Sequence, residues 1–457
     1  MDNNINNDLL TGSIKKNLLR IALPTMLGFF LQAVYDIVDM IWIGRISSQA
    51  VAGVTIFSTV FWLVTILNEI IGTSSVSLIT QSYGMKDERR TQRIVEQTLA
   101  FKAMVAIISA LIMVVFLKPL LSFFTTEEEV LNAALDYGYI RIFFLPIMFS
   151  SYSVNTALRC LGDAKTPMFI MIAASVANII LDPLFMFQTI PGTSIPGLSM
   201  GVFGAGLATV ISTVIAFSLG FFILLRGKAK IKIDLKGLFK LDWSIDKKLL
   251  TIGLPTGIEM LSRNLSAVFT LKFVSIYGTN TVAAMGIGGR LLNFAFMPIM
   301  GIATGSSTIV GQCLGAEDVE RAKDTAKFSA FVNFVMMTAV SILAIIFPKQ
   351  IMKIFIDDID VINVGKPMIQ IITPALIGGG IAMGLGSVFS GSGHNTPFLL
   401  SSLISRWGVQ VPLLFLVTKI FNLSALYVWI SFLVADAIEM VIVFIAYKKG
   451  KWETYRV

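Results

Sequence analysis

Long apolar stretches alternate with short polar connections along almost the whole chain of 457 residues. Most stretches reach the length of about 20 residues that an α-helix needs to cross a bilayer. Their apolar residues run continuously instead of alternating with polar ones, so the pattern predicts helices and not the strands of a barrel. We expect twelve spans, near residues 17–43, 50–82, 91–117, 132–160, 166–187, 199–225, 249–276, 281–313, 325–347, 364–391, 396–418 and 424–447.

The second half of the chain repeats the first at a fixed offset of 231 positions. The segment Leu18–Thr25 returns as Leu249–Thr256, and the register still holds where Asp87 pairs with Asp318. Six spans per copy return the chain to the same side, which predicts an all-α integral membrane protein of two parallel six-helix bundles. We expect an N-terminal bundle, a basic cytoplasmic linker and a C-terminal bundle at residues 1–226, 227–248 and 249–457.

Composition agrees with a membrane protein, and the basic residues predict its orientation. Hydrophobic residues make up 55% of the chain, and the mean hydropathy is +0.80. The connections on one side of the membrane hold 23 Lys and Arg residues, against six on the other. The positive-inside rule therefore places both termini in the cytoplasm, and we expect the plasma (inner) membrane. Because the net charge of +8 is spread over loops that flank the membrane, we expect no nucleic-acid partner.

Several features that the sequence lacks disfavour an enzyme. There is no nucleotide-binding glycine loop and no Cys/His metal cluster, and the single histidine is His394. ATP hydrolysis is therefore not expected, which leaves an ion gradient as the energy source. An intramembrane prenyl transferase would need clustered aspartates that hold Mg²⁺, and Asp36 with Asp39 is one pair in one copy. We expect a transporter with no cofactor besides its coupling ion.

Acidic residues inside the predicted spans are the main functional candidates, because an ionised group at the bilayer centre costs roughly 2.5–3.5 kcal/mol on insertion scales. Asp36 and Asp39 are three positions apart in the first span and share a helix face. Asn178 and Asp182 are four apart in the fifth span and also share a face. The second copy has no carboxylate matching Asp39 or Asp182, which argues against a purely structural role for these acids.

Other charged residues in the spans leave more than one interpretation open. Asp36 lies either in a cavity or nearer the outer end of its helix, in a structural role. Glu69 forms either a buried hydrogen bond or ion pair, or part of a cation relay. Glu259 precedes Arg263 by four positions, a spacing at which the two charges neutralise each other. Four further charges are expected to be paired inside the C-terminal bundle: Arg290, Arg406, Asp436 and Glu439.

Six motifs, in order and over both repeats, resemble those of one transporter family. They are Asp39–Arg45, Gln81–Asp87, Leu161–Pro167, Asn178–Pro183, Gly204–Thr209 and Gly311–Ala316. With these motifs the chain resembles the multidrug and toxic compound extrusion (MATE) exporters. The resemblance implies two six-helix bundles that face each other across a central cleft. It also implies export of organic cations and other amphipathic drugs against inward flow of H⁺ or Na⁺.

The resemblance also implies a coupling-cation site in the N-terminal bundle. Its residues are Asp39, Asn178, Asp182 and Thr209. Carboxylate, amide and hydroxyl oxygens suit a hard cation such as Na⁺, and two close carboxylates can also share a proton. The residue types therefore leave H⁺ and Na⁺ both open.

Further residues follow for a substrate cavity. By resemblance, Tyr35, Tyr137 and Asn155 line the cavity, and Asp36 and Glu69 are added as intramembrane acids. The resemblance also places Pro24 where the family bends its first helix on protonation. Family members with a second cation site carry acids in the seventh and tenth spans. Since the tenth span here has no acid, the resemblance does not support that second site.

One alternative function remains for a chain of this architecture. Flippases for lipid-linked saccharides have a related two-bundle fold, but they tend to carry basic residues in the central cavity. The acids of the first and fifth spans favour cationic substrates instead. We expect a monomer whose partners are small amphipathic or cationic molecules and membrane lipids.

Overall fold

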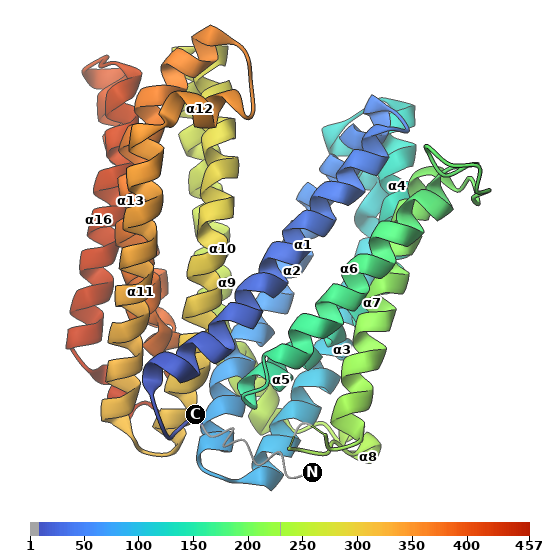
Figure 1. The fold of residues 1–457 in the computed structure, drawn as a ribbon, viewed down its shortest axis with the longest axis vertical. Coiled ribbons are helices and arrows are strands. Elements are labelled where there is room, and N and C mark those ends of the chain that lie inside the picture. Colours follow the sequence, from blue (N-terminus) through green and yellow to red (C-terminus); the bar gives the residue numbers. More distant parts are fainter. Residues whose placement is uncertain (1–8, 229) are drawn as a thin grey trace. The chain divides into compact units, whose positions relative to one another are not determined.

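The chain is described by a computed structural model that covers residues 9–228 and 230–457. These residues are almost entirely helical and contain no strand, apart from one isolated bridge between Thr189 and Pro196. They form two compact units, whose helices are drawn in Figure 1. We call Leu27–Thr251 the N unit, and we call residues 9–26 together with Ile252–Val457 the C unit. The prediction of an all-α fold is confirmed.

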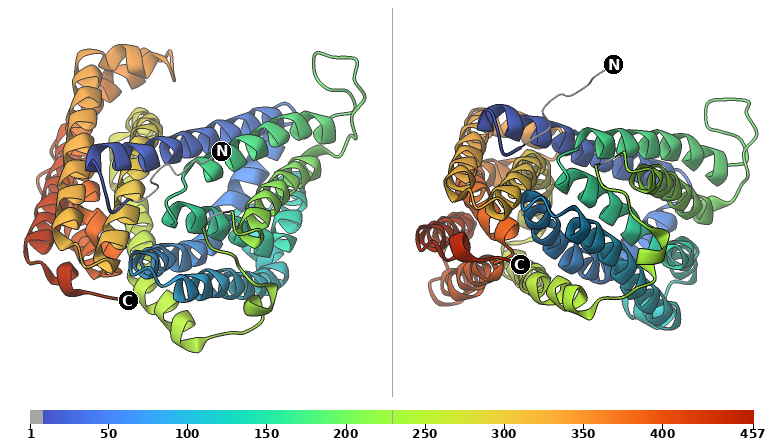
Figure 2. Two further views of the ribbon diagram at one scale, coloured as in Figure 1. Left: turned by 60° about the horizontal axis from the view of Figure 1, so that its bottom comes forward. Right: turned by 90° about the horizontal axis from the view of Figure 1, so that it is seen from below.

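The N unit is built from the helices of the first half of the chain. Helices α6 and α7 run side by side in all views, and the loop of residues 187–200 joins them at one end (Figures 1 and 2). The helices are α1 (Ile14–Gly44), α2 (Ser48–Gly84), α3 (Glu88–Phe124), α4 (Glu128–Phe143), α5 (Leu145–Cys160), α6 (Lys165–Met186), α7 (Gly201–Leu225) and α8 (Leu235–Leu238).

The C unit is built around α13, which packs against α10, α11 and α16. An added Cβ at Gly384 of α13 would clash with the backbone of Ala330, so a residue without a side chain allows the close approach of α11. The helices are α9 (Trp243–Val274), α10 (Thr279–Gly315), α11 (Val319–Ile346), α12 (Pro348–Lys353), α13 (Ile359–Ser392), α14 (Thr396–Ser402), α15 (Val411–Phe415), α16 (Ala425–Lys448) and α17 (Lys451–Thr454). Three shorter segments are the 3₁₀ turn η1 (Ser275–Tyr277) and the π-helices η2 (Leu403–Gln410) and η3 (Leu416–Ile420).

Most of the predicted spans are present as long apolar helices. Within the described residues, ten helical segments are long and apolar enough to cross a membrane, and the bent pair α4–α5 makes an eleventh. The chain is therefore a multi-pass membrane protein. Helix α9 lies at the predicted seventh span, but it falls outside this set. The physical reason is its charged residues, Asp246, Lys247, Lys248, Glu259, Arg263 and Lys272.

The predicted fourth span is not one continuous helix. The sequence pattern predicted a single helix over residues 132–160, whereas α4 and α5 meet at Phe144 with a bend of 58°. Pro146 is in the first turn of α5, where it cannot donate a backbone N–H and disfavours a helical conformation of the residue before it. The prediction of an unbroken helix was therefore wrong at this point.

The repeat is visible in local structure as well as in sequence. Asp87 and Asp318, which match at the offset of 231, both cap the helix that follows. The carboxylate of Asp87 accepts a hydrogen bond from the backbone N–H of Arg90 at 2.9 Å, and that of Asp318 accepts one from Arg321 at 3.0 Å. Each cap satisfies a backbone donor that the first turn of a helix leaves without an intrahelical partner.

Two helices belong partly to each unit. Helix α1 begins in the C unit and continues into the N unit after Met26, and α9 begins in the N unit and continues into the C unit after Thr251. The units therefore change over inside α1 and α9, and not in the linker of residues 227–248 that the sequence analysis placed between the two bundles.

The segment before α1 is bound within the C unit by one side chain. The guanidinium of Arg321, at the start of α11, donates hydrogen bonds to the backbone carbonyls of Leu9 (3.0 Å), Thr11 (3.0 Å) and Gly12 (3.1 Å). The amide of Asn17 donates to the carbonyl of Thr11 at 2.7 Å. These contacts fix the chain where it enters the helix that carries Asp36 and Asp39.

The segment before α9 is bound in a similar way within the N unit. Arg93, near the start of α3, donates to the carbonyls of Gly237 (3.0 Å) and Lys240 (2.6 Å). The side-chain carbonyl of Gln97 accepts a hydrogen bond from the backbone N–H of Asp242 at 2.8 Å. The basic linker is thus an ordered part of the N unit in its second half.

The Arg321 contacts generate a prediction about the entry to α1. Arg321→Gln should speed tryptic cleavage after the exposed Lys15 and Lys16, because charge-assisted hydrogen bonds worth about 1–3 kcal/mol are lost and the segment opens more often. Lys327→Gln is the control, since the Lys327 ammonium makes only an exposed ion pair with Asp324 at 3.4 Å. Equal cleavage rates in both variants and the parent protein would contradict the assignment.

Candidate functional site

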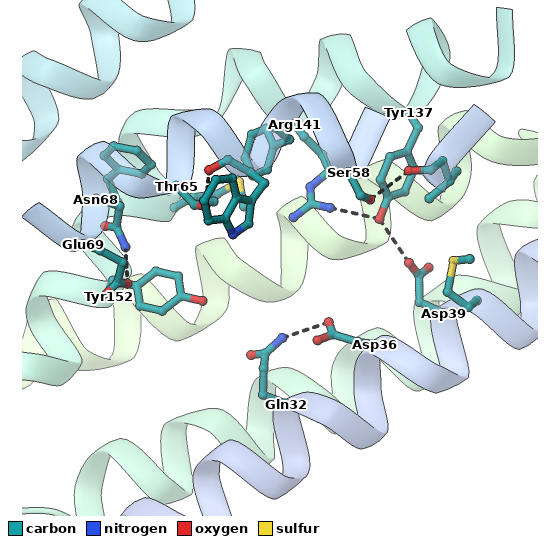
Figure 3. A pocket seen from close by; sticks show the side chains of 16 residues that line it. Gln32, Asp36, Asp39, Ser58, Thr65, Asn68, Glu69, Tyr137, Arg141 and Tyr152 are labelled. Carbon is teal, nitrogen blue, oxygen red and sulfur yellow. Dashed lines mark hydrogen bonds between the residues drawn. The ribbon is translucent and has the colours of Figure 1, made fainter. Parts of the chain in front are cut away.

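A cavity of about 360 Å³ lies inside the N unit, between α1, α2, α4 and α5 (Figure 3). Four charged side chains line the cavity: Asp36, Asp39, Glu69 and Arg141. Aromatic rings supply much of the remaining wall, namely Phe61, Trp62, Tyr137, Phe149 and Tyr152. Rings next to carboxylates form a surface that suits an amphipathic cation, because both cation–π contacts and ion pairs are available.

Asp39 is connected to Arg141 through a tyrosine. The hydroxyl of Tyr137 donates a hydrogen bond to Oδ2 of Asp39 at 3.0 Å, and Nη1 of Arg141 donates to the Tyr137 oxygen at 3.1 Å (Figure 3). Asp39 is only 6% exposed. Tyr137 and Arg141 are four positions apart on α4, so one helix face presents both side chains to the cavity.

Arg141 is a residue that the sequence analysis missed. It lies inside the predicted fourth span, where a basic residue four positions after Tyr137 was an available signal. The centre of its guanidinium lies 5.0 Å from the ring centre of Phe61 and 5.2 Å from that of Tyr137. The cavity is therefore acidic, but it also contains one fixed positive charge.

Asn178 and Asp182 form the second part of the expected cation site. Both side chains are fully buried on α6, and the amide of Asn178 donates to Oδ1 of Asp182 at 3.0 Å. This is the shared helix face that the four-residue spacing predicted. The carboxylate of Asp182 is also within electrostatic range of Asp39, so the acids of α1 and α6 influence each other.

Thr209 joins the same group from α7. Its hydroxyl donates to the backbone carbonyl of Ala205 at 3.1 Å and lies next to the hydroxyls of Tyr35 and Tyr137. The structure thus brings together the residues that the resemblance assigned to the cation site, on α1, α6 and α7. Whether they bind a cation stays a prediction.

Three buried oxygen atoms in this group have no hydrogen-bond donor in the described part of the chain. They are Oδ1 of Asp39, Oδ1 of Asn178 and Oδ2 of Asp182. Leaving a buried acceptor without a donor costs about 1–3 kcal/mol, so the arrangement favours uptake of a proton or a small cation. Among the described residues no three His, Cys, Asp or Glu side chains converge, so a bound Na⁺ would draw on amide and hydroxyl oxygens as well.

The other predicted cavity residues have different positions. Asp36 lines the cavity and accepts a hydrogen bond from the amide of Gln32 at 3.1 Å (Figure 3). Tyr35 and Asn155 are not among the described residues that line it. Tyr35 instead lies beside Thr209. The side-chain carbonyl of Asn155 is buried and has no donor within the described residues.

Glu69 also lines the cavity, from α2, whereas Asp39 lines it from α1. The Glu69 carboxylate accepts a hydrogen bond from the amide of Asn68 at 3.3 Å. Lys102 is only 1% exposed, and both Lys102 and Arg159 interact electrostatically with the Glu69 carboxylate. A buried cation needs such a counter-charge, so the structure favours a buried hydrogen-bonded or ion-paired role for Glu69 over a cation relay.

Charged residues of the C unit form a separate ion-pair network. Arg263 donates to Glu259 and to Glu439, both at 2.7 Å. Arg406, on the π-helix η2, donates to Asp436 and, at 3.3 Å, to Glu439. These pairs agree with the expectation that the charges neutralise each other. Arg290 differs, because its side chain is exposed and forms no ion pair in the described part of the chain.

Sequence comparison identifies the family. The MatE family model matches the chain twice, over residues 24–184 and over residues 255–416. The chain therefore belongs to the MatE family. The two matches to the MatE model begin 231 positions apart, which is the offset of the internal repeat. The family resemblance found in the sequence motifs is confirmed.

Curated relatives of this MatE chain are aligned over nearly its full length. It is 28% identical over 444 residues to the probable multidrug resistance protein YoeA of Bacillus subtilis, covering 96% of this chain and 95% of that protein. It is 27% identical over 448 residues to the probable multidrug resistance protein NorM of Thermotoga maritima, covering 96% and 93%.

Solved structures share the fold of this MatE chain. One is the outward-facing conformation of a multidrug resistance MATE family transporter of the MOP superfamily, with a TM-score of 0.89, 22% identity and 98% of both chains covered. Another, with the same score, identity and coverage, is a MOP superfamily transporter from Pyrococcus furiosus described as having a binding pocket of reverse polarity.

The hydroxyl between Asp39 and Arg141 generates a second prediction. Tyr137→Phe should lower the free energy of unfolding by about 1–3 kcal/mol, because Asp39 loses its donor and Arg141 loses its acceptor. Thermal unfolding in detergent measures the loss. Tyr152→Phe is the matched control, since its ring lines the same cavity and its hydroxyl makes no hydrogen bond to the described residues. A loss of equal size in both variants would refute the bridging role.

Proposed function

We propose that this protein is a secondary active antiporter that exports organic cations and other amphipathic drugs from the cytoplasm in exchange for H⁺ or Na⁺. The observation that carries the proposal is the set of three buried oxygens on Asp39, Asn178 and Asp182 that have no donor among the described residues. A proton or a Na⁺ ion supplies the missing partner. The adjoining cavity, with its rings and carboxylates, supplies the place for the second, larger ligand.

The names of relatives support the same proposal. Proteins aligned over most of this chain are called multidrug resistance or multidrug export proteins, including MepA of Staphylococcus haemolyticus. We propose that the protein is a transporter and not an enzyme. The coupling ion, H⁺ or Na⁺, would be its only inorganic ligand.

Exchange follows from the coupling between the two sites. The cation site includes Asp39, which also lines the substrate cavity, so a cation at Asp39 and a cationic substrate compete for one carboxylate. Such competition forces the two ligands to bind alternately. A proton that crosses about 150 mV supplies roughly 3.5 kcal/mol, which sustains a gradient of a few hundredfold in a neutral substrate.

The membrane and the orientation belong to the proposal as well. The basic connections predict cytoplasmic termini, and we propose the plasma membrane, a monomeric working unit and small amphipathic substrates.

A flippase for lipid-linked saccharides is the second candidate. Arg141 is the observation that favours it, since a basic cavity residue suits a phosphate-bearing substrate. Three carboxylates in the same cavity favour the cation exporter.

Ethidium efflux under a pH gradient and, separately, under a Na⁺ gradient tests the proposal. We expect efflux under at least one gradient, and Asp182→Asn should abolish it because the substitution removes an ionisable carboxylate from the cation site. Asp136→Asn, at an exposed acid of α4, should export normally.

The two gradients also identify the coupling ion, as the one whose gradient drives efflux. Undiminished efflux by a correctly inserted Asp182→Asn protein would exclude Asp182 from coupling. If the parent protein exports no ethidium under either gradient, the flippase becomes the better explanation.

A further inference from the structure

We propose that Arg141 binds an anionic group of the substrate, so that the cavity takes zwitterionic amphipathic molecules in preference to simple cations. This inference deepens the proposed export function and rests on it. Arg141 would recognise the anionic group of the substrate, which the carboxylates of the cavity repel.

The first observation is that Arg141 has donors to spare. A guanidinium carries five N–H groups, and the structure gives Arg141 one hydrogen bond, from Nη1 to the Tyr137 hydroxyl at 3.1 Å. Nε is buried and has no acceptor in the described residues. Figure 3 shows one terminal nitrogen joined to Tyr137 and the other pointing away from it.

The second observation is that no carboxylate pairs directly with Arg141. Within the described residues no Asp or Glu oxygen lies within 4.0 Å of its guanidinium, although Asp36 and Asp39 line the same cavity. A residue present only to neutralise Asp39 would be expected to contact it, as Arg263 contacts Glu259 at 2.7 Å in the C unit. Arg141 instead reaches Asp39 through the Tyr137 hydroxyl.

The third observation is that the guanidinium is held in place without using its remaining donors. It lies over the rings of Phe61 and Tyr137, with centre distances of 5.0 and 5.2 Å. Ring contacts orient the planar group and leave available the end that carries its two terminal nitrogens, whereas Nε is buried. A guanidinium edge matches a carboxylate with two parallel hydrogen bonds.

The charges of the cavity then specify the ligand. The guanidinium attracts an anionic group, and the carboxylates of Asp36 and Asp39 attract a cationic group of the same molecule. A simple cation meets the acids but is repelled by Arg141. A molecule with a cationic group, an anionic group and an aromatic ring system can contact the carboxylates, Arg141 and the aromatic side chains of the cavity at once.

Equilibrium binding to the full purified chain tests the inference with two probes that differ in one group. The probes are a rhodamine dye with a free carboxylate and the methyl ester of the same dye, and fluorescence anisotropy reports binding of both. The parent protein should bind the free acid about tenfold more tightly than the ester, the ratio expected for one charge-assisted hydrogen-bonded pair. Arg141→Gln should lose this preference and bind the ester with unchanged or improved affinity.

Control variants separate charge recognition from general damage. Arg226→Gln removes an exposed arginine at the end of α7 that does not line the cavity, and it should keep the preference for the acid. Retained ester binding by Arg141→Gln shows that the variant is folded. If that variant does not fold, Arg141→Lys replaces it, and it should show a smaller preference for the acid than the parent protein.

The outcomes distinguish this inference from the proposed function. Equal affinity of the parent protein for acid and ester, or an acid preference that survives in Arg141→Gln, overturns the role of Arg141. Ester export driven by an ion gradient together with equal affinities would leave the antiporter standing without this inference. Absence of gradient-driven export of both probes would count against the antiporter itself.

Discussion

A charged side chain inside an apolar bundle needs a partner within the protein, because lipid offers none. In the N unit the central case is Asp39, whose carboxylate is only partly hydrogen-bonded. One oxygen of Asp39 accepts a hydrogen bond from Tyr137, and the other has no donor among the described residues. The carboxylate is therefore held in position without being neutralised. A site of this kind can take up and release a cation, whereas Glu259 and Glu439 of the C unit are already paired with Arg263.

Much of the fold and part of the site could be predicted from the sequence. Continuous apolar runs determined most helices, because a lipid-exposed backbone must satisfy its own hydrogen bonds. The pair of Asn178 and Asp182 was predictable because a spacing of four places two side chains on one helix face, and the structure joins them. The matching caps of Asp87 and Asp318 show that the repeat preserves local structure even where the surrounding side chains differ.

The remaining features depend on contacts between distant segments, which a pattern along one chain does not contain. The bend between α4 and α5 needed the local effect of Pro146 to outweigh a continuous apolar run. Arg141 was missed because a search for acids does not weigh a basic residue, and its environment comes from α1 and α2 as well as α4. Arg290 was predicted to be paired inside the C-terminal bundle, but its side chain is exposed and has no ion-pair partner among the described residues.

The contacts that hold the second half of the linker go largely to backbone atoms. Arg93 binds two main-chain carbonyls, and Gln97 accepts from a main-chain N–H. Such contacts depend on the path of the backbone more than on the side chains of the segment, except at Gly237, where an added Cβ would clash with the carboxylate of Glu96. One inserted or deleted residue would shift every bound carbonyl out of register. The exposed positions of the segment should therefore tolerate substitution better than the segment tolerates a change of length.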